Sequence, residues 1–431
     1  MALEVWREFL GNYELVGSFT GSAPRERLFT YADSYLSNGH AHAIATSLPL
    51  RHEAYNEREY SAVFGGMVPE GAVRMELSQR FQIPSSDYLS LLERLGDECI
   101  GALRFRASEL SESESYRPLT TADEKLLSRN WSGFAISSMQ ESRLSLTGAQ
   151  SKTGLYLKKD SNPADAPIDA WLLPIGSAPS THILKVTSED ANLLASNEYV
   201  CMECARMCGL SVAESWVSKT LPRTFISRRF DRSWSDGIRM IDGLPIPFRL
   251  HQEDFCQALG WEYYSKYEVD PTSCYARICG ELIRRTSFDA LSDVRSFARQ
   301  VAFDYVIGNC DSHLKNHSFL YSPSWSARRL APAYDIVSTT VLGYDHNLGM
   351  SIGDHRRIEE VCPEDLSLFV GDVHATRRLF LEDCSRIVEE LPNALRQFRD
   401  QDEQFSEVAS TILDDIQPRL LVLQAFCSRG V

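Results

Sequence analysis

The stretch VIGNCDSHLKNHSFLY, residues 306–321, sets an aspartate, Asp311, five positions before an asparagine, Asn316. His313 and Lys315 lie between them, and hydrophobic residues flank the group on both sides. After about residue 245 the sequence pattern is mostly helical, and the strand-like HSFLY interrupts it here. The stretch therefore predicts several polar functional groups held close together beside a short strand.

The composition limits the class of protein around this stretch. The chain has 431 residues, of which 43% are hydrophobic, so it can bury a sizeable core, and its length suggests two or three domains or subdomains. The formal net charge of −15 argues against a surface that follows DNA phosphates over the whole molecule, because such surfaces need clustered Lys and Arg. We expect any DNA contact to be local or made through a partner.

The start of the chain and the cysteines indicate a cytoplasmic protein with reduced thiols. MALEVWREFLGNYELVG lacks the regions of a secretory signal, and no run of about 18 apolar residues occurs, so we expect no membrane partner. Eleven irregularly spaced cysteines do not suggest a disulfide framework. Cys201, Cys204 and Cys208 recur at helical spacing, which favours a buried helix face over a metal site.

The patterns along the chain predict four parts. Residues 1–106 combine β-like runs such as YELVGSFTG with two amphipathic helical patterns, the second over Asp87–Leu103, and the RFR segment that follows is a candidate strand. Residues 107–124 are rich in Ser and Glu and predict an exposed linker. Residues 125–245 predict a β-rich lobe, and residues 246–431 predict a helical lobe. The expected fold class is α+β.

Within the β-rich lobe, RLSLTGAQSKTGLYLKK (residues 143–159) alternates like a hairpin around a Gly-containing turn. THILKVT (residues 181–187) is a second strand candidate, expected in the same sheet. A helical pattern follows over residues 190–210 and stops at Gly209. VAESWVSKT (residues 212–220) and RTFISRRFD (residues 223–231) predict two further strands.

The spacing of polar groups points to phosphoryl transfer. This chemistry needs cations on the phosphates, oxygen ligands for Mg²⁺ and an acceptor for the hydroxyl proton. In D-x-x-x-x-N, Asp311 can face the nucleophile while Asn316 reaches back to a metal. Asp335, in APAYDIV, can bridge Mg²⁺ to the phosphates. Catalytic Asp, metal Asn and then metal Asp is the order found in protein kinases.

Upstream residues supply the remaining parts in the expected order. Lys185 ends the strand-like THILK and would neutralise phosphate charge, and Glu198 on the following helix could orient it. The turn of residues 147–152 would present backbone N–H groups and Lys152 to the phosphates. It lacks the Gly before Lys of a Walker A loop. The alternatives without a role in catalysis are that Lys185 is a surface lysine whose stem packs on apolar neighbours and that His313 only caps its loop.

Seven motifs resemble the HipA-like serine/threonine kinases of bacterial toxin–antitoxin modules. They are SLTGAQSKT (145–153), THILK (181–185), NEYVC (197–201), RRFDRSW (228–234), RLHQEDFCQALG (249–260), IGNCDSHLKN (307–316) and APAYDIVS (331–338). SLPLRHEAY and FGGMVPEGAVRMELSQRF resemble the small N-terminal subdomain of that family. The resemblance covers nearly the whole chain and implies a two-lobed, protein-kinase-like fold.

The resemblance also implies residue roles and cofactors, which are ATP and Mg²⁺. Asp311 would be the catalytic base, Asn316 and Asp335 the metal ligands, and Glu198 an orienting residue. A serine beside the glycine loop is autophosphorylated in this family and the loop is then ejected, which implies Ser145 or Thr147 here; a phosphate would repel the ATP phosphates. The nucleotide-binding residues would be Thr147, Gly148, Ala149, Gln150, Ser151, Lys152, Lys185, Arg228, Arg229, Phe230, Asp231, His313, Lys315 and Tyr334.

The partners implied are a HipB-like helix-turn-helix antitoxin and a protein substrate such as an aminoacyl-tRNA synthetase. The sequence departs from relatives at Arg228, where many have Glu in the hinge, and at Ser312, where Gly is frequent. Arg396 and Arg399 are the only suggestive basic pair near the C-terminal helices, so DNA would be reached only through the antitoxin. Two other hypotheses remain: a co-repressor of the antitoxin with weak kinase activity, and a small-molecule kinase.

Overall fold

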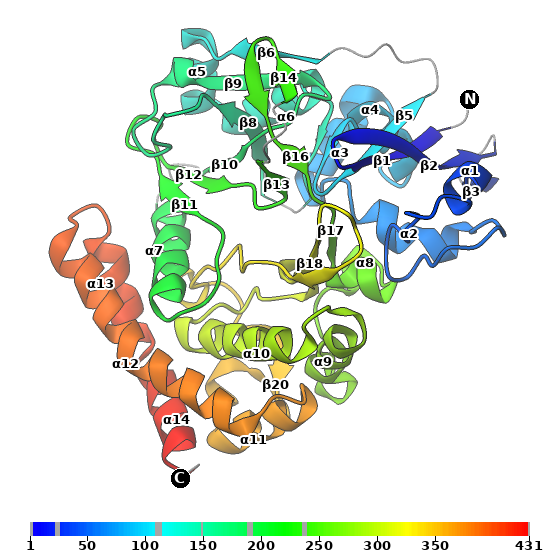
Figure 1. The fold of residues 1–431 in the computed structure, drawn as a ribbon. Helices are drawn as coiled ribbons and strands as arrows, with labels where there is room; N and C mark the ends of the chain where they lie inside the picture. Colours follow the sequence, from blue (N-terminus) through cyan, green and yellow to red (C-terminus); the bar gives the residue numbers. More distant parts are fainter. Residues whose placement is uncertain are drawn as a thin grey trace. The chain divides into compact units, whose positions relative to one another are not determined.

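The computed structural model describes residues 3–21, 26–107, 114–147, 150–187, 193–234 and 239–429. Its contacts form two compact units, each considered by itself below. Unit 1 comprises residues 1–188, 216–263 and 320–327, and unit 2 comprises residues 189–215, 264–319 and 328–431. Figure 1 labels the helices and strands of both units.

The N-terminal part of unit 1 contains an antiparallel sheet with the strand order β3-β2-β1-β5. Alternating residues of these strands face an aromatic cluster in which the rings of Phe19, Phe29 and Phe64 lie about 5 Å apart. Asn56 and Glu59 form a capping box that starts the helix α2, so this end is fixed by the local sequence. The elements are β1 (Leu3–Phe9), β2 (Asn12–Thr20), β3 (Leu28–Tyr31), α1 (Asp33–Leu36), α2 (Glu57–Gly65), α3 (Gly71–Phe81), α4 (Tyr88–Leu95), β4 (Glu98–Cys99) and β5 (Leu103–Ala107).

The second sheet of unit 1 has six strands in the order β11-β12-β10-β8-β9-β6. Trp171, Leu155 and Leu184 form its buried core with apolar residues of α5 and α6. The elements are β6 (Glu114–Pro118), α5 (Thr121–Arg129), α6 (Trp131–Glu141), β7 (Leu144–Ser145), β8 (Lys152–Leu157), β9 (Trp171–Gly176), β10 (His182–Val186), β11 (Ser215–Val217), β12 (Thr224–Arg228), β13 (Arg232–Ser233), β14 (Arg239–Ile241), β15 (Leu244–Ile246), β16 (Phe248–Arg249), β17 (Gln252–Asp254) and α8 (Phe255–Leu259).

Most predicted strands of this sheet are confirmed, and the pairing of β10 with β8 places THILK beside KTGLYL as expected. The predicted hairpin over residues 143–159 is wrong, because β7 pairs in parallel with β4 and not with β8. The expected linker also needs correction: residues 114–118 form β6, which pairs with β9. Residues 108–113 lie outside the described residues. The helix predicted over Asp87–Leu103 ends at Leu95, because Gly96 follows and the chain turns into β4.

Unit 2 is mostly helical. Its helix α7 ends at Met207, two residues before the predicted stop, and its cysteines Cys201, Cys204 and Cys208 are fully buried, which confirms the predicted helix face. Figure 1 shows α12 (orange) running beside α14 (red), which lies at the end of the chain. The elements are α7 (Leu194–Met207), α9 (Tyr275–Thr286), α10 (Ala290–Ile307), β19 (Arg328–Leu330), β20 (Asn347–Ile352), β21 (His355–Arg357), α11 (Pro363–Asp372), α12 (Arg377–Gln401), α13 (Ser406–Asp415) and α14 (Gln417–Ser428). The strand β18 (Ser318–Tyr321) begins in unit 2, and its last two residues belong to unit 1.

Candidate active site

The candidate catalytic loop, residues 309–317, follows the C-cap of α10. That cap is Gly308, whose φ of +82° is a left-handed conformation that glycine adopts without strain. A Cβ atom at this position would lie 2.1 Å from the hydroxyl oxygen of Thr340, so no larger residue fits without a shift of Thr340. The close packing of Gly308 therefore fixes the point at which the chain leaves α10 and enters the loop.

Hydrogen bonds within the loop bring Asp311 and Asn316 together. The side-chain amide of Asn316 donates to the backbone carbonyl of Asp311 over 2.8 Å, and the backbone N–H of His313 donates to the same carbonyl over 2.9 Å. The side chain of Asp311 is exposed, whereas Asn316 is 6% exposed. The spacing D-x-x-x-x-N thus closes a tight loop that presents one carboxylate at the surface of unit 2.

A buried aspartate of α10 supports this loop from below. One carboxylate oxygen of Asp304 accepts from the amide of Asn309 (2.9 Å), and the other accepts from the hydroxyl of Ser312 (2.7 Å). Burial raises the pKa of Asp304 to about 7, although these two hydrogen bonds oppose the shift. The side chains of Asn309 and Ser312, which flank Asp311 in the sequence, therefore both bind the carboxyl group of Asp304.

His313, Lys315 and Tyr334 lie around the same loop. Burial lowers the pKa of His313 to about 3, so its ring is neutral at pH 7, and its Nδ1 atom is buried without a hydrogen-bond partner among the described residues. The hydroxyl of Tyr334 donates to the backbone carbonyl of Lys315 over 2.8 Å. The three residues predicted to line the nucleotide therefore share one region of unit 2, and Nδ1 of His313 is an orphaned polar atom that a ligand could satisfy.

Asp335 has a left-handed backbone, with φ of +60°. This conformation is uncommon for a residue other than glycine, and such strain is concentrated at functional sites. The segment that follows is fixed to α7, because the side chain of Asn197 exchanges two hydrogen bonds with the backbone of Ser338 (2.8 and 3.1 Å). Glu198, the next residue on α7, is 2% exposed.

The donor set of the loop fits Mg²⁺ bound together with a nucleotide. Within the part of the chain that the structure describes, no group of three His, Cys, Asp or Glu side chains could hold a metal alone. Mg²⁺ usually takes only one or two protein ligands when phosphates and water supply the rest. The amide nitrogen of Asn316 donates within the loop, so its amide oxygen is the atom that would bind a hard cation, and Asp335 would supply a carboxylate.

In unit 1, two lysines face each other across neighbouring strands. Lys185 of β10 lies directly opposite Lys152 of β8, and the Nζ atom of Lys185 lies 5.4 Å from the ring centroid of Phe225. Lys185 is only 6% exposed, so the alternative interpretation as a surface lysine is wrong. Like charges directly opposite each other cost stability, and an anion such as phosphate would offset that cost.

The predicted phosphate loop begins at the end of β7. Ser145 is fully buried, and its hydroxyl donates to the backbone carbonyl of Met67 over 2.8 Å. Thr147 is partly exposed, yet its hydroxyl oxygen is buried without a hydrogen-bond partner in the part of the chain that the structure describes. Ser151 accepts a hydrogen bond at its carbonyl from Trp131 (3.1 Å), and Gln150 is also partly exposed, whereas Gly148 and Ala149 lie outside the described residues.

The predicted hinge contains a buried charge cluster, defined here as Glu98, Arg229, Asp231, Arg232 and Arg249. The guanidinium of Arg229 contacts Glu98 (3.0 Å) and Asp231 (2.7 Å), and Arg232 contacts Glu98 over 2.7 Å. All five side chains are at most 5% exposed. The Asp231 carboxylate also accepts from the backbone N–H of Gly101 (2.7 Å).

In the charge cluster, the side chains of Arg229 and Asp231 form buried ion pairs, which gives both a structural role. Burial alone would raise the pKa of Glu98, but Arg232, Arg249 and Arg229 together lower it below its usual value. A nucleotide contact through the Asp231 side chain is therefore not favoured by this geometry. A hinge contact through the backbone is compatible with it, and Arg228, which is exposed and lies 5.6 Å from the Trp216 ring centroid, is outside the cluster.

Sequence reasoning missed three residues of these regions: Asp304, Glu98 and Tyr267. The hydroxyl of Tyr267 donates to a carboxylate oxygen of Asp311. A single aspartate within the apolar run AFDYVI was the available signal for Asp304. Glu98 gave no comparable signal, because its arginine partners are more than a hundred residues away in the chain.

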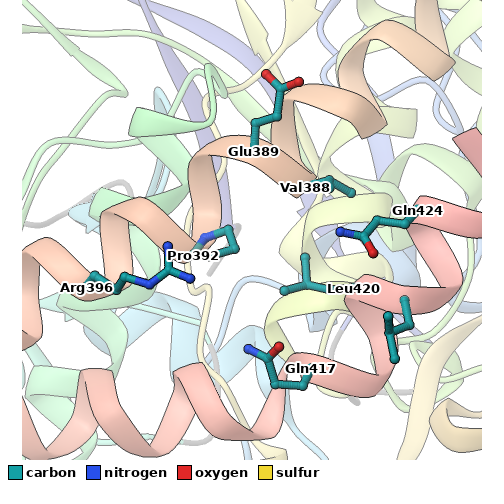
Figure 2. A pocket seen from close by; sticks show the side chains of 8 residues that line it. Val388, Glu389, Pro392, Arg396, Gln417, Leu420 and Gln424 are labelled. Carbon is teal, nitrogen blue, oxygen red and sulfur yellow. The ribbon is translucent and has the colours of Figure 1, made fainter.

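Two further observations bear on other kinds of site. A pocket of about 250 Å³ in unit 2 is lined by residues of α12 and α14, among them Pro392, Arg396 and Leu420 (Figure 2). None of the predicted site residues lines this pocket. No helix in the described ranges combines the length and the apolar character needed to cross a membrane.

Two family models match most of this chain. A family model described as the HipA-like C-terminal domain matches residues 144–404, and one described as the HipA N-terminal domain matches residues 9–106. A Sinorhizobium fredii protein named "Putative kinase Y4mE" is 30% identical over 393 residues, which cover 88% of this chain and 89% of that protein. The "Serine/threonine-protein kinase toxin HipA" of Shewanella oneidensis is 25% identical, covering 82% of this chain and 80% of that protein.

The fold is also that of a solved structure. HipA in a complex of Shewanella oneidensis HipA, HipB and operator DNA superposes with a TM-score of 0.78 at 20% identity, covering 99% of each chain. This match confirms the predicted two-lobed, kinase-like α+β fold. Since a family model spans more than half of the chain and a relative at 30% identity covers most of it, the chain belongs to the HipA-like family.

Proposed function

We propose that the chain is an ATP- and Mg²⁺-dependent protein serine/threonine kinase that acts as the toxin of a toxin–antitoxin module. The observation that supports this most is the loop in which Asn316 binds the backbone of Asp311 while the Asp311 carboxylate stays exposed. The family and the kinase names of its relatives support the reaction class.

In the proposed reaction, Asp311 accepts the proton of a serine or threonine hydroxyl. The hydroxyl oxygen bonds to the γ-phosphorus of ATP, the bond from that phosphorus to the β–γ bridging oxygen breaks, and ADP leaves. Mg²⁺, held by Asn316 and Asp335, would neutralise charge on the phosphates. Lys185 and Lys152 would bind the phosphates, Glu198 would orient Lys185, and residues 147–152 would surround them with backbone N–H groups.

The remaining nucleotide contacts are proposed as follows. The backbone of residues 228–230 would bind the adenine, and His313, Lys315 and Tyr334 would line the nucleotide. The neutral ring of His313 supports this, because its Nδ1 atom has no partner within the described residues. Among the hinge residues we keep Asp231 as a contact only through its backbone, since arginines and Gly101 engage its carboxylate.

Self-phosphorylation would occur at Ser145 or Thr147. Ser145 is buried in β7, so a kinase could reach its hydroxyl only after β7 separates from β4 and the bond to Met67 breaks. Thr147 needs less rearrangement because it is partly exposed. A phosphate at either residue would repel the ATP phosphates and switch the enzyme off.

A HipB-like helix-turn-helix antitoxin is the proposed partner, as the fold neighbour was solved in complex with HipB and operator DNA. The proposed substrate is a translation component such as an aminoacyl-tRNA synthetase. The net charge of −15 supports contact with DNA only through the antitoxin. We place the protein in the cytoplasm, where such partners occur.

The test is transfer of ³²P from ATP and Mg²⁺ into phosphatase-treated protein, with the labelled residue mapped by mass spectrometry. Wild type is compared with Asp311→Asn and with Asp400→Asn, a matched change at an exposed aspartate of α12. We expect label at Ser145 or Thr147 in wild type and Asp400→Asn and none in Asp311→Asn. Equal labelling of all three proteins would refute the role of Asp311, and no labelling with intact antitoxin binding would favour the co-repressor.

A further inference from the structure

A short segment of unit 2, Tyr264–Asp270, is anchored against the candidate catalytic loop. We call it the strap. The carbonyl of Lys266 accepts from the backbone N–H of Leu314 in the loop over 3.2 Å, and the backbone N–H of Glu268 donates to the carbonyl of Gly349 in β20 over 2.9 Å. Two backbone groups of the strap, the carbonyl of Lys266 and the N–H of Glu268, are thus bound to the loop and to β20.

Glu268 fixes the strap more firmly. Its side chain is fully buried, and its carboxylate accepts from the backbone N–H groups of Tyr275 (3.0 Å) and Ser351 (2.6 Å). Tyr275 is the first residue of α9, where a negative charge is favourable because helix N-terminal N–H groups lack partners. The elements β20 and α9, labelled in Figure 1, therefore share one buried carboxylate from the strap.

Tyr267 lies between these two anchors. Its hydroxyl donates to an Oδ1 atom of the exposed Asp311, and its ring packs edge-on against His313 with a centroid distance of 4.9 Å and an interplanar angle of 78°. The neighbours Lys266 and Glu268 hold the backbone on either side, so the position of the phenol is set by the fold. A hydrogen bond to a charged acceptor is stronger than one between neutral groups.

We propose that Tyr267 is a positioning residue for the proposed phosphotransfer. It orients the carboxylate of Asp311 through one oxygen so that the other oxygen takes the proton of the acceptor hydroxyl. Each rotamer of Asp311 that turns the carboxylate away from the acceptor removes the base from the reaction, and the hydrogen bond from Tyr267 favours one rotamer. This inference rests on the proposed function, because it assigns a role to Tyr267 only if Asp311 acts as the base.

The test is Tyr267→Phe, which removes one hydroxyl and keeps the ring against His313. We expect the first-order rate of self-phosphorylation at saturating ATP to fall about 10-fold, as the loss of an orienting hydrogen bond typically does. The ATP concentration that gives half the maximal rate should stay unchanged, and so should the urea unfolding curve. Tyr344→Phe, at a tyrosine of unit 2 that is 56% exposed, is the control and should match wild type.

Three outcomes separate this inference from the proposed function. If wild type is active, Asp311→Asn is inactive and Tyr267→Phe is slow with an unchanged fold, the positioning role is supported. If Tyr267→Phe is as fast as wild type, or faster because its hydroxyl had competed with the acceptor, the positioning role is refuted while the function stands. If wild type and Asp311→Asn do not differ, both fail.

Discussion

The charge cluster of unit 1 and the catalytic loop of unit 2 both contain buried polar side chains, but their partners differ. In the cluster, the carboxylates of Glu98 and Asp231 meet arginines, and burial is offset by opposite charge. Beside the loop, Asp304 of α10 accepts hydrogen bonds from the neutral donors Asn309 and Ser312, and burial raises its pKa to about 7. The comparison teaches that the charge cluster is stabilised by opposite charges, while the carboxyl group of Asp304, which binds two residues next to the exposed Asp311, has neutral donors.

Removal of Glu98 should give the largest loss of stability, because it leaves three arginines buried without their shared carboxylate. We expect Glu98→Ala to lower the free energy of unfolding by about 3–5 kcal/mol, the typical cost of a broken buried ion pair. Urea unfolding followed by circular dichroism measures it. As a control, Glu364→Ala, which breaks an exposed pair with Arg429, should leave the unfolding curve unchanged. A wild-type curve for Glu98→Ala would show that the cluster is not structural.

In contrast to Glu98, Lys185 should matter more for phosphoryl transfer than for the stability of the fold. Lys185→Met should reduce ³²P transfer about 100-fold, since it would remove a cation from the ATP phosphates. Its effect on the free energy of unfolding should be smaller than that of Glu98→Ala, because it relieves repulsion from Lys152 directly opposite. The same unfolding and transfer assays test this. A large loss of stability with normal transfer would assign Lys185 to the same structural class as Glu98.

The raised pKa of Asp304 should make the free energy of unfolding depend on pH. Its pKa is raised in the folded protein from 3.8 to about 7, so the folded state binds more protons than the unfolded state between these values. Stability from this group is therefore present below about pH 4 and lost as the pH rises towards 7. Asp304→Asn mimics the protonated carboxyl and should flatten this part of the wild-type pH profile of unfolding. Parallel profiles for the two proteins would contradict a raised pKa.

The smallest expected effect compares two hydroxyls near the phosphate loop. Ser145→Ala removes the buried hydrogen bond to Met67 and should cost about 1 kcal/mol of unfolding free energy. Thr147→Ala should cost less, since the hydroxyl of Thr147 is buried without a partner within the described residues. Thermal and urea unfolding of the two variants decide the order. A larger loss in Thr147→Ala would mean that the hydroxyl of Thr147 is engaged.

The local patterns predicted much of the fold. The strands β10 and β12, the helix α7 and the loop after α10 follow from alternation, helical period and a terminal glycine, all of which are local in sequence. The strand β1 was not predicted, and residues 114–118 were assigned to a linker, since a strand at the edge of a sheet is fixed by its neighbour β9 more than by its own residues.

The site could be predicted only where its groups are close in the chain. Asp311 and Asn316 are five residues apart, so their association was visible in the spacing. The roles of Arg229 and Asp231 could not be predicted, because Glu98 comes from a part of the chain that is distant in sequence. These side chains form structural ion pairs where the sequence had suggested contacts with the nucleotide. Tyr267 was missed for the same reason: its contact with Asp311 spans 44 positions of the chain. The roles of the predicted ligands of ATP and Mg²⁺ stay predictions.

The most direct test of the central claim is the rate of ³²P transfer from ATP by Asp311→Asn, measured on protein whose urea unfolding curve is recorded in the same preparation. Asp311 is exposed, so the variant should unfold like wild type, and loss of the base should slow transfer by at least about 100-fold. Transfer at the wild-type rate by the folded variant would show that Asp311 is not the base, and the account of the loop as an active site would fail.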